Sequence, residues 1–266
     1  MDIKEIQNNN INISRHPWEL ARVEILIRFL KEATQNIDKS AISIIDIGCG
    51  DLFVLEKISD ILKFDEFYGI DIAIDDENVK RLESKYQRKK IHILNDLTNL
   101  TIHKNNISIV LLNDIIEHVV DDKTFLLNLQ ENSFINEKTI FIITVPAFQY
   151  LFCSHDTYLE HYRRYNNSQL VKLLKNSNYI INSDGYFFFS LLIPRLVKVF
   201  KEKNFGIQKK QNEIKGTDLT NWKGNKFVSL LIKNILLFDY FLTSFFKKLK
   251  IKIPGLSTYA ICKKSV

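Results

Sequence analysis

One short segment concentrates side chains suited to acid–base chemistry. Residues 154–165 read SHDTYLEHYRRY, and no other stretch of the chain is as rich in ionisable and aromatic groups. An imidazole titrates near neutral pH. His161 is therefore the first candidate for a general base that takes a proton from a hydroxyl, and His155 is the second. Asp156 could orient either histidine, which predicts a site where an acceptor group loses its proton.

The same segment holds groups that could bind an anion. Arg163 and Arg164 follow Tyr162 directly. A guanidinium binds a carboxylate or phosphate through two parallel hydrogen bonds, so we predict that these three residues bind the substrate. The alternative is that one arginine pairs with Glu160 or another acid of the chain, and that His161 only fills a polar corner of the fold.

A second group of residues indicates a nucleotide-like ligand. The sequence DIGCG at 46–50 places two glycines directly after an isoleucine-rich run, where they let the backbone turn sharply and approach a ligand. Asp71 follows Gly50 by 21 residues and ends the next apolar run, which suits a carboxylate that accepts hydrogen bonds from a ribose diol. Asp96 ends the third run. This order predicts an adenosine site; the alternative is that Asp46 and Asp71 only cap the helices that follow.

These residues need a rigid frame, and the chain has the pattern of a parallel sheet. Five short runs rich in isoleucine and valine, typical of strands buried on both faces, alternate with helical patterns. The alternation predicts an α/β fold: a doubly wound, Rossmann-like, mostly parallel sheet with helices on both faces. Ligands of such sheets bind at the carboxyl ends of the strands. The predicted strands lie within residues 41–50, 66–72, 90–96, 107–114 and 138–146, with a further strand near 179–189 and helices at 17–33 and 168–176.

The composition describes a compact protein with an uneven distribution of charge. Of 266 residues, 45% are hydrophobic and only 8 are glycine and 4 proline, which excludes disordered and collagen-like chains. Residues 1–189 carry 21 basic and 27 acidic residues, a net charge of −6, whereas residues 190–266 carry 16 and 4, a net charge of +12. We therefore predict a cofactor-binding domain with an N-terminal helix at 1–189 and a basic, apolar helical appendage at 190–266.

The three cysteines argue against a disulfide framework. Cys49, Cys153 and Cys262 are odd in number and far apart, which suits a reducing compartment. The CxxC spacing of metal ligands is absent, and we expect no metal. Because the N-terminus lacks the apolar segment of a secretory signal, we expect a cytoplasmic protein.

Two apolar runs in the basic part predict contact with a membrane surface. The runs at 186–200 and 227–252 are interrupted by Pro194 and by polar residues, so neither is a clean span of about 20 apolar residues. Between 227 and 246 the apolar residues recur at steps of three and four, and lysines follow. This pattern is typical of a helix at an anionic membrane interface, here the inner face of the cell membrane. The alternative is a stripe that covers the sheet or a partner subunit. Nucleic acid is not expected as a partner, because the basic charge is mixed with long apolar runs.

The glycine turn and the strand ends resemble those of the class I S-adenosylmethionine-dependent methyltransferases, over about residues 15–185. DIGCG resembles their first motif, and Asn113–His118 resembles their fourth-strand motif. The resemblance implies S-adenosyl-L-methionine as the cofactor and methyl transfer as the activity. One departure is Leu52, where the family often has a third glycine; the same absence argues against a dehydrogenase. The residues that the resemblance assigns to the cofactor are Asp46, Gly48, Cys49, Gly50, Asp71, Ile72, Asp96, Leu97 and Asn113.

Further motifs resemble a bacterial subset of these methyltransferases associated with glycan and glycolipid biosynthesis. They are VPA at 145–147, the SHD and HYRRY motifs that follow it, RHPWELAR at 15–22 and PGLSTYAICKK at 254–264. This resemblance implies methyl transfer to a hydroxyl, or less readily an amine, of a small-molecule or lipid-linked saccharide. Two other functions stay open: a cofactor-binding scaffold without turnover, and a nucleic-acid methyltransferase, for which the chain shows no NPPY-like motif.

Overall fold

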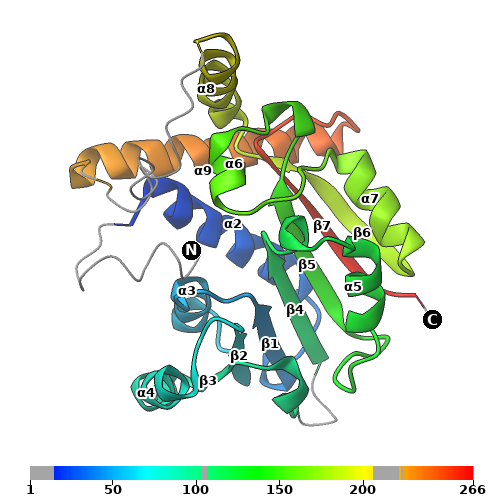
Figure 1. Cartoon of the computed structure of the whole chain (residues 1–266). Coiled ribbons are helices and arrows are strands. Elements are labelled where there is room, and N and C mark those ends of the chain that lie inside the picture. Colours follow the sequence, from blue (N-terminus) through cyan, green and yellow to red (C-terminus); the bar gives the residue numbers. More distant parts are fainter. Residues whose placement is uncertain (1–14, 103–106, 206–221, 223, 266) are drawn as a thin grey trace.

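The centre of the protein is a single sheet (Figure 1). The computed structural model describes residues 15–102, 107–205, 222 and 224–265, and within them the sheet has seven strands in the order β3-β2-β1-β4-β5-β7-β6. The first five strands in this order pair in parallel, whereas β7 runs antiparallel to both of its neighbours. The predicted α/β class with a mostly parallel sheet is confirmed. The strands are β1 (Ile42–Ile47), β2 (Glu66–Ile70), β3 (Ile91–Leu94), β4 (Ile107–Asn113), β5 (Ile140–Pro146), β6 (Tyr179–Phe187) and β7 (Ser257–Lys264).

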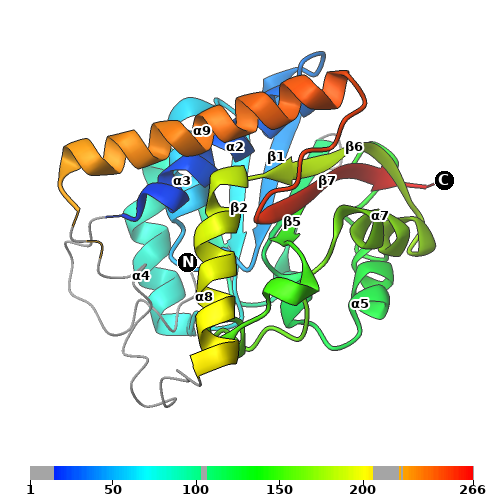
Figure 2. The ribbon, with the colours of Figure 1, turned by 90° about the horizontal axis from the view of Figure 1, so that it is seen from above.

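Helices cover both faces of this sheet (Figure 2). Successive side chains of a strand point to opposite faces, so Ile44 of β1 lies in one hydrophobic cluster and Ile45 in the other. The first cluster contains residues of α2, α3, α4 and α9, and the second contains residues of α5 and α7. These helices are α2 (Pro17–Ala33), α3 (Phe53–Ile61), α4 (Asp76–Tyr86), α5 (Asp122–Leu129), α7 (Asn167–Asn176) and α9 (Lys226–Lys248). Two further helices are the short α6 (Ser154–Tyr158) and α8 (Leu192–Phe205), which lies at the outside of the molecule.

The C-terminal segment contributes a strand between β5 and the edge strand β6. β7 pairs with β5 from Ile140↔Lys263 to Pro146↔Ser257, and with β6 on its other side. One sheet therefore takes strands from both sides of the boundary that the charge pattern predicts between residues 189 and 190.

The core also joins the two ends of the chain. Phe29 of α2 is fully buried, and its ring lies 5.7 Å from that of Tyr240 on α9 and 4.3 Å from that of Tyr259 on β7, measured between centroids. Its third aromatic neighbour is Phe187 at the end of β6. An N-terminal helix thus packs directly on elements that follow residue 178.

Two helices of the basic part leave an apolar face exposed. α9 packs on α2 through Leu236 and Tyr240, while α8 lies on the outside of the molecule (Figures 1 and 2) and buries Leu192 and Val199 on its inner side. Pro194 lies in the first turn of α8, where a missing N–H costs little. Among the described helices, α9 alone is long and apolar enough to cross a membrane, and 22% of its most apolar window is buried. The exposed apolar residues are Ile193, Leu196, Val197 and Phe200 on α8, and Phe227, Val228, Leu230, Leu231, Ile235, Phe238, Phe241 and Phe245 on α9.

The four lysines in the last turn of α9 and the loop after it divide into two pairs. Lys247 donates to Ser183 Oγ at 2.6 Å and to Tyr259 OH at 3.1 Å, and Lys252 forms an ion pair with Asp184. These two lysines hold the end of α9 and the following loop against β6 and β7. Lys248 and Lys250 are exposed.

We expect Phe29→Ala to lower the free energy of unfolding by about 3–5 kcal/mol, because it leaves a cavity among fully buried rings. Urea unfolding followed by circular dichroism measures the change. The matched control is Phe238→Ala on α9, whose ring is 57% exposed and whose loss should cost far less. Equal effects of the two substitutions would contradict the packing of α9 and β7 on α2.

Candidate functional site

The glycine turn follows β1 and is held by the neighbouring strand. Gly48 and Gly50 have positive φ angles of 72° and 56°, which L side chains rarely adopt. The backbone N–H groups of Gly48 and Cys49 both donate to Ile70 O, at 2.7 and 3.2 Å. A Cβ atom at Gly48 would clash with Ile115. The turn therefore requires glycine at this position and leaves its backbone at the carboxyl end of the sheet.

Two of the predicted acids follow the adjacent strands β2 and β3. Asp71 comes directly after β2, where one carboxylate oxygen accepts from Gly50 N at 2.9 Å and the other from Ala73 N at 3.0 Å. Asp96 follows β3 and accepts from Thr98 N at 2.8 Å, a hydrogen bond that holds its pKa below the usual value. Asp71 is thus fixed against the glycine turn, whereas Asp96 also caps a short helical turn. Beside Asp71, the side chain of Ile72 is 91% exposed.

Asp46 is a buried carboxylate behind the turn. Its side chain is 2% exposed, and Asn113 Nδ2 donates to Asp46 Oδ1 at 3.3 Å across the β1–β4 pair. Burial raises the pKa of Asp46 from 3.8 to about 7, because the charged form loses its hydration. Asn113, which the sequence assigns to the cofactor, therefore contacts the same carboxylate that begins the glycine motif.

Leu52 does not obstruct the turn. It has a positive φ angle of 64°, and its side chain is fully buried in the core. It packs so closely on Gly69 of β2 that a Cβ atom there would clash with it. The bulky residue that departs from the expected glycine pattern therefore packs into the core beside β2.

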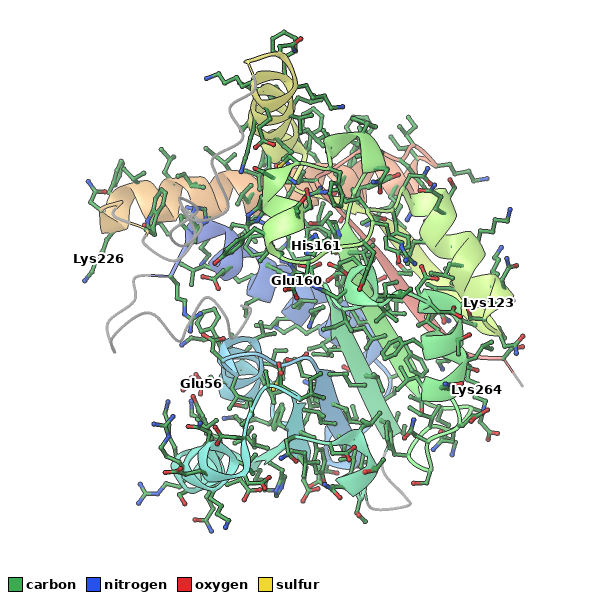
Figure 3. All side chains as sticks on the ribbon, viewed as in Figure 1. Glu56, Lys123, Glu160, His161, Lys226 and Lys264 are labelled. Carbon is green, nitrogen blue, oxygen red and sulfur yellow. The ribbon has the colours of Figure 1, made fainter. Side chains whose placement is uncertain are left out.

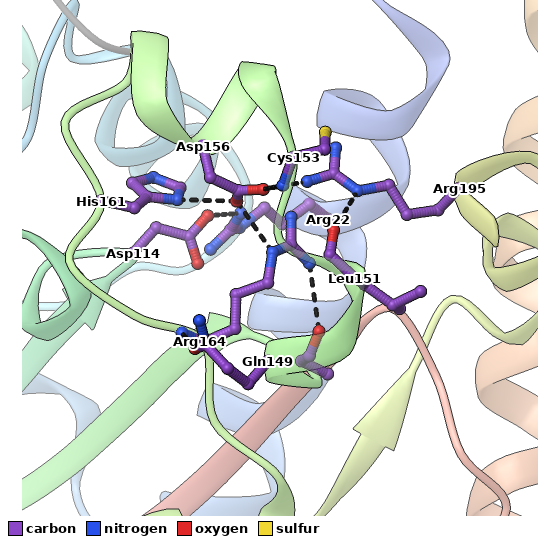
Figure 4. Close-up of polar contacts among 10 residues, drawn as sticks. Arg22, Asp114, Gln149, Leu151, Cys153, Asp156, His161, Arg164 and Arg195 are labelled. Carbon is purple, nitrogen blue, oxygen red and sulfur yellow. Dashed lines mark hydrogen bonds and ion pairs between the residues drawn. The ribbon is translucent and has the colours of Figure 1, made fainter. Parts of the chain in front are cut away.

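A second cluster centres on one buried carboxylate (Figure 4). Asp156 is fully buried on α6 and accepts hydrogen bonds from His161 Nδ1 at 3.0 Å, from Arg164 Nε at 2.8 Å and from Cys153 N at 2.9 Å. Arg195 of α8 forms a further ion pair with it. Burial alone would raise the pKa of Asp156, but the bond from His161 and the charges of Arg164 and Arg195 hold that pKa well below its usual range. Asp156 is therefore an anion that fixes the orientation of His161.

The backbone places His161 close to the fourth strand. His161 N donates to Asp156 O at 2.9 Å, and Tyr162 N donates to Glu117 O at 2.8 Å. Glu117 and His118 belong to the short helical turn η4 (Ile116–His118) just after β4. The rings of His118 and His161 meet edge to face, with centroids 4.6 Å apart. His161 thus lies beside α6, near the middle of the molecule (Figure 3).

The remaining predicted residues of the segment take different positions. His155 is half-buried, and burial, with the nearby charges of Arg195 and Lys198, lowers its pKa to about 3, so this imidazole is neutral at physiological pH. Tyr162 is 55% exposed. The structure brings Asp156 to His161, and the catalytic roles of all three predicted residues stay predictions.

Both predicted arginines are engaged with acids of the chain. Arg163 donates to Asp122 Oδ2 at 2.8 Å and to Val120 O at 2.7 Å, and its side chain is 30% exposed. Arg164 is buried and donates to Ala147 O at 3.1 Å besides Asp156. This is the pairing that the sequence left open as the alternative. A role in binding the substrate stays a prediction, and the exposed guanidinium of Arg163 fits it better than that of Arg164.

Several residues of the site were not found from the sequence. Arg22 of α2 is buried, forms an ion pair with the half-buried Asp114 and donates to Thr144 Oγ1 at 2.6 Å. Glu117 is fully buried, and both burial and the nearby Asp114 raise its pKa well above the usual range. Neither carboxylate oxygen of Glu117 has a hydrogen-bond partner among the described residues. The motifs containing Arg22 and Glu117 were recognised, but nothing in their local pattern indicates burial or partners so distant in the chain.

Comparison with known proteins agrees with this geometry. Residues 45–131, about a third of the chain, match a family model. The model describes a methyltransferase domain. The matched range begins at the glycine turn and includes Asp71, Asp96, Asn113 and Glu117. No sequence among curated proteins matches the chain.

Similar solved structures show the same fold at low sequence identity. Geranyl diphosphate methyltransferase in complex with S-adenosylmethionine has a TM-score of 0.53 at 9% identity, covering 92% of this chain and 85% of its own. The plantazolicin methyltransferase BamL, in complex with S-adenosylhomocysteine, has 0.52 at 15% identity, with the same coverages. The cyclase SpnF has 0.51 at 12% identity, covering 91% of this chain and 80% of its own. These similarities show the fold and do not by themselves fix the reaction; the matched model describes a methyltransferase domain within residues 45–131.

The raised pKa of Asp46 predicts a specific dependence of stability on pH. The pKa of Asp46 is about 7 in the folded protein and 3.8 without burial. Between pH 4 and pH 7 the folded state therefore binds a proton at Asp46 that the unfolded state has lost. The stability that this proton contributes decreases as pH rises from 4 to 7. We expect Asp46→Asn to lose less stability than the wild type between pH 4 and pH 7, as measured by urea unfolding at a series of pH values. Glu83→Gln on the exposed face of α4 is the control and should follow the wild type. Parallel curves for Asp46→Asn and the wild type would contradict the assignment.

Proposed function

We propose that this protein transfers a methyl group from S-adenosylmethionine to a hydroxyl, or less readily an amine, of a bacterial glycan or glycolipid precursor. The observation that carries the proposal is the pairing of His161 Nδ1 with the buried, ionised Asp156. This pair lies next to η4, and η4 follows the strand whose last residue, Asn113, contacts the carboxylate of the glycine motif. A cofactor turn and a candidate proton acceptor therefore share one edge of the sheet.

The residues present fit the proposed cofactor. When bound, S-adenosylmethionine supplies an electrophilic methyl group on a cationic sulfonium. The glycine turn gives backbone access, and the buried carboxylate of Asp46 suits a ligand with positive charge. Asp71 is oriented by Gly50 N and can accept hydrogen bonds from ribose hydroxyls, while the exposed Ile72 offers an apolar surface to the adenine. Cys49, Asp96 and Leu97 complete the proposed contacts.

His161 is proposed as the residue that accepts the proton of the acceptor hydroxyl. With Nδ1 bound to Asp156, Nε2 is the nitrogen that can take a proton from a substrate. The ionised Asp156 then stabilises the imidazolium, as a buried carboxylate next to a catalytic histidine does. Methyl transfer is an in-line displacement, so a fixed imidazole also helps to align the acceptor oxygen. Arg164 and Arg195 serve this step indirectly, because they keep Asp156 charged.

The exposed faces of α8 and α9 support the lipid-linked form of the substrate. Both helices present large apolar side chains, and the chain from residue 190 carries a net charge of +12. Apolar surface together with lysines favours an anionic membrane interface. α8 contacts the segment of residues 154–165 at two points. Arg195 pairs with Asp156, and Glu202 accepts hydrogen bonds from Ser154. A peripheral position on the inner membrane face would bring a membrane-bound saccharide to His161.

Two substitutions should affect cofactor affinity and turnover separately. We expect Asp71→Ala to weaken S-adenosylmethionine binding in calorimetric titration, since the ribose loses its carboxylate. His161→Ala should leave that affinity unchanged and lower turnover on a soluble or lipid-linked glycan acceptor by about 10²–10⁴-fold, the usual contribution of a general base. His92→Ala, which removes a 45% exposed imidazole from β3, is the control and should change neither quantity. Loss of cofactor affinity in His161→Ala, with unchanged turnover at saturation, would assign this residue to the wrong site.

Binding to vesicles tests the membrane part of the proposal. We expect the protein to sediment with vesicles containing anionic phospholipid at low salt, and a triple substitution of Phe227, Phe238 and Phe241 by Ser to abolish this. Ile61→Ser removes an apolar side chain that is also 51% exposed, but on α3, and should have no effect. A wild-type protein that stays wholly in the supernatant would refute membrane contact while leaving the cofactor site untouched.

A further inference from the structure

Three potential metal ligands meet where η4 approaches the loop after α6. They are Glu117, His118 and His161, and one ligand atom from each lies within 4.8 Å of the other two. Glu117 and His118 are neighbours in the chain, whereas His161 reaches them through the backbone contact of Tyr162 N with Glu117 O. The cluster therefore arises from tertiary structure, which explains why a search for regular ligand spacing in the sequence missed it.

The carboxylate of Glu117 is the observation that points to a ligand. It is fully buried, and both of its oxygens lack a hydrogen-bond partner among the described residues. Burying a carboxylate without a partner is costly. Protonation would remove the charge, but the resulting O–H would be a buried donor that still needs an acceptor. A cation bound between Glu117 and the two imidazoles would neutralise the charge and occupy its lone pairs.

His161 is oriented as a metal ligand commonly is. Its Nδ1 lies 3.0 Å from a carboxylate oxygen of Asp156, so a proton on Nδ1 is held by that carboxylate and the lone pair of Nε2 faces elsewhere. A histidine that binds a metal usually donates its other N–H to a carboxylate or carbonyl, which fixes the ring and strengthens the ligand. Arg164 and Arg195 support Asp156 in turn.

We propose that Glu117, His118 and His161 bind one divalent first-row transition cation. Two imidazole nitrogens and one carboxylate oxygen suit zinc, cobalt, iron or manganese rather than magnesium or calcium. Bonds of about 2.0–2.2 Å place ligand atoms roughly 3–3.5 Å apart, so these side chains move inward by about an ångström when the ion binds. Three protein ligands leave coordination positions open at the proposed acceptor site.

The metal site is inferred from the three side chains and does not depend on the proposed function. A bound cation would, however, change the proposed role of His161. A bound cation uses Nε2 of His161, the atom assigned above to the acceptor's proton. In the metal-bound protein an acceptor hydroxyl can bind at an open position, where the cation lowers the pKa of that hydroxyl. The cation and the free imidazole are alternative ways to activate the same acceptor.

Cobalt binding tests the site without any need for a substrate. The full chain, free of affinity tags, is treated with a chelator, transferred to chelator-free buffer and titrated with Co²⁺. We expect one equivalent to bind with visible d–d absorption and to be displaced by Zn²⁺. Glu117→Gln and His118→Ala should each weaken binding by at least about tenfold, the lower bound seen even for the loss of supporting residues around a metal. His92→Ala is the control, because His92 lies on the surface 3.8 Å from Glu66 and could bind metal adventitiously.

Two results would overturn the metal site. One is the absence of stoichiometric binding; the other is binding that survives Glu117→Gln and is lost in His92→Ala. Urea unfolding and calorimetric titration with S-adenosylmethionine are run on the same samples. A folded Glu117→Gln variant that binds the cofactor but not cobalt supports the proposal. Cobalt binding by a wild type that binds no cofactor would refute the proposed function and leave the metal site standing.

Discussion

The site depends on one buried carboxylate that is kept charged. Asp156 has no exposed surface, and it is surrounded by His161, by two guanidiniums and by a backbone N–H. A buried ion pair is a poor source of net stability, but the loss of one partner is costly because a buried charge stays uncompensated. The partners of Asp156 are therefore held in place, and with them the elements that carry them. These elements are the loop of residues 159–165, the short helix α6 and the helix α8.

This constraint links the surface of the molecule to its chemistry. Arg195 lies on the inner side of α8 and reaches Asp156, while neighbouring residues such as Leu196 and Phe200 are exposed. Glu202, one to two turns further along, holds Ser154 at the start of α6. α8 is thus a direct support of the proposed acceptor site and at the same time the most projecting apolar element in Figure 1. A surface that holds α8 would act on the orientation of His161 through the Arg195–Asp156 ion pair and the hydrogen bonds of Ser154 with Glu202.

The two halves of the site are positioned by different means. Strand pairing sets the proposed cofactor half, since the register of β1 with β4 brings Asp46 to Asn113 and the β1–β2 contact fixes the glycine turn. Ion pairs set the acceptor half, where Arg22 reaches Asp114 from α2 and Arg195 reaches Asp156 from α8. The similarity to both methyltransferases and a cyclase fits this division. A common sheet can carry different reactions when the residues above it differ.

The sequence by itself determined the sheet and the cofactor turn, because both are written in short-range patterns. Strand runs, the DIGCG turn and the helix at Pro17–Ala33 follow from periodicity and from glycine's freedom at positive φ. Only the tertiary structure decided that Asp156 pairs with Arg195, 39 residues away, that Arg22 pairs with Asp114, 92 residues away, and that β7 enters the sheet between β5 and β6. Such contacts form only when packed elements bring distant charges and strand edges together. A local pattern of residue types does not indicate which distant residues will become neighbours. Arg164 is an example. Its place in the sequence predicts a residue that binds the substrate, but the fold buries it against the carboxylate of Asp156.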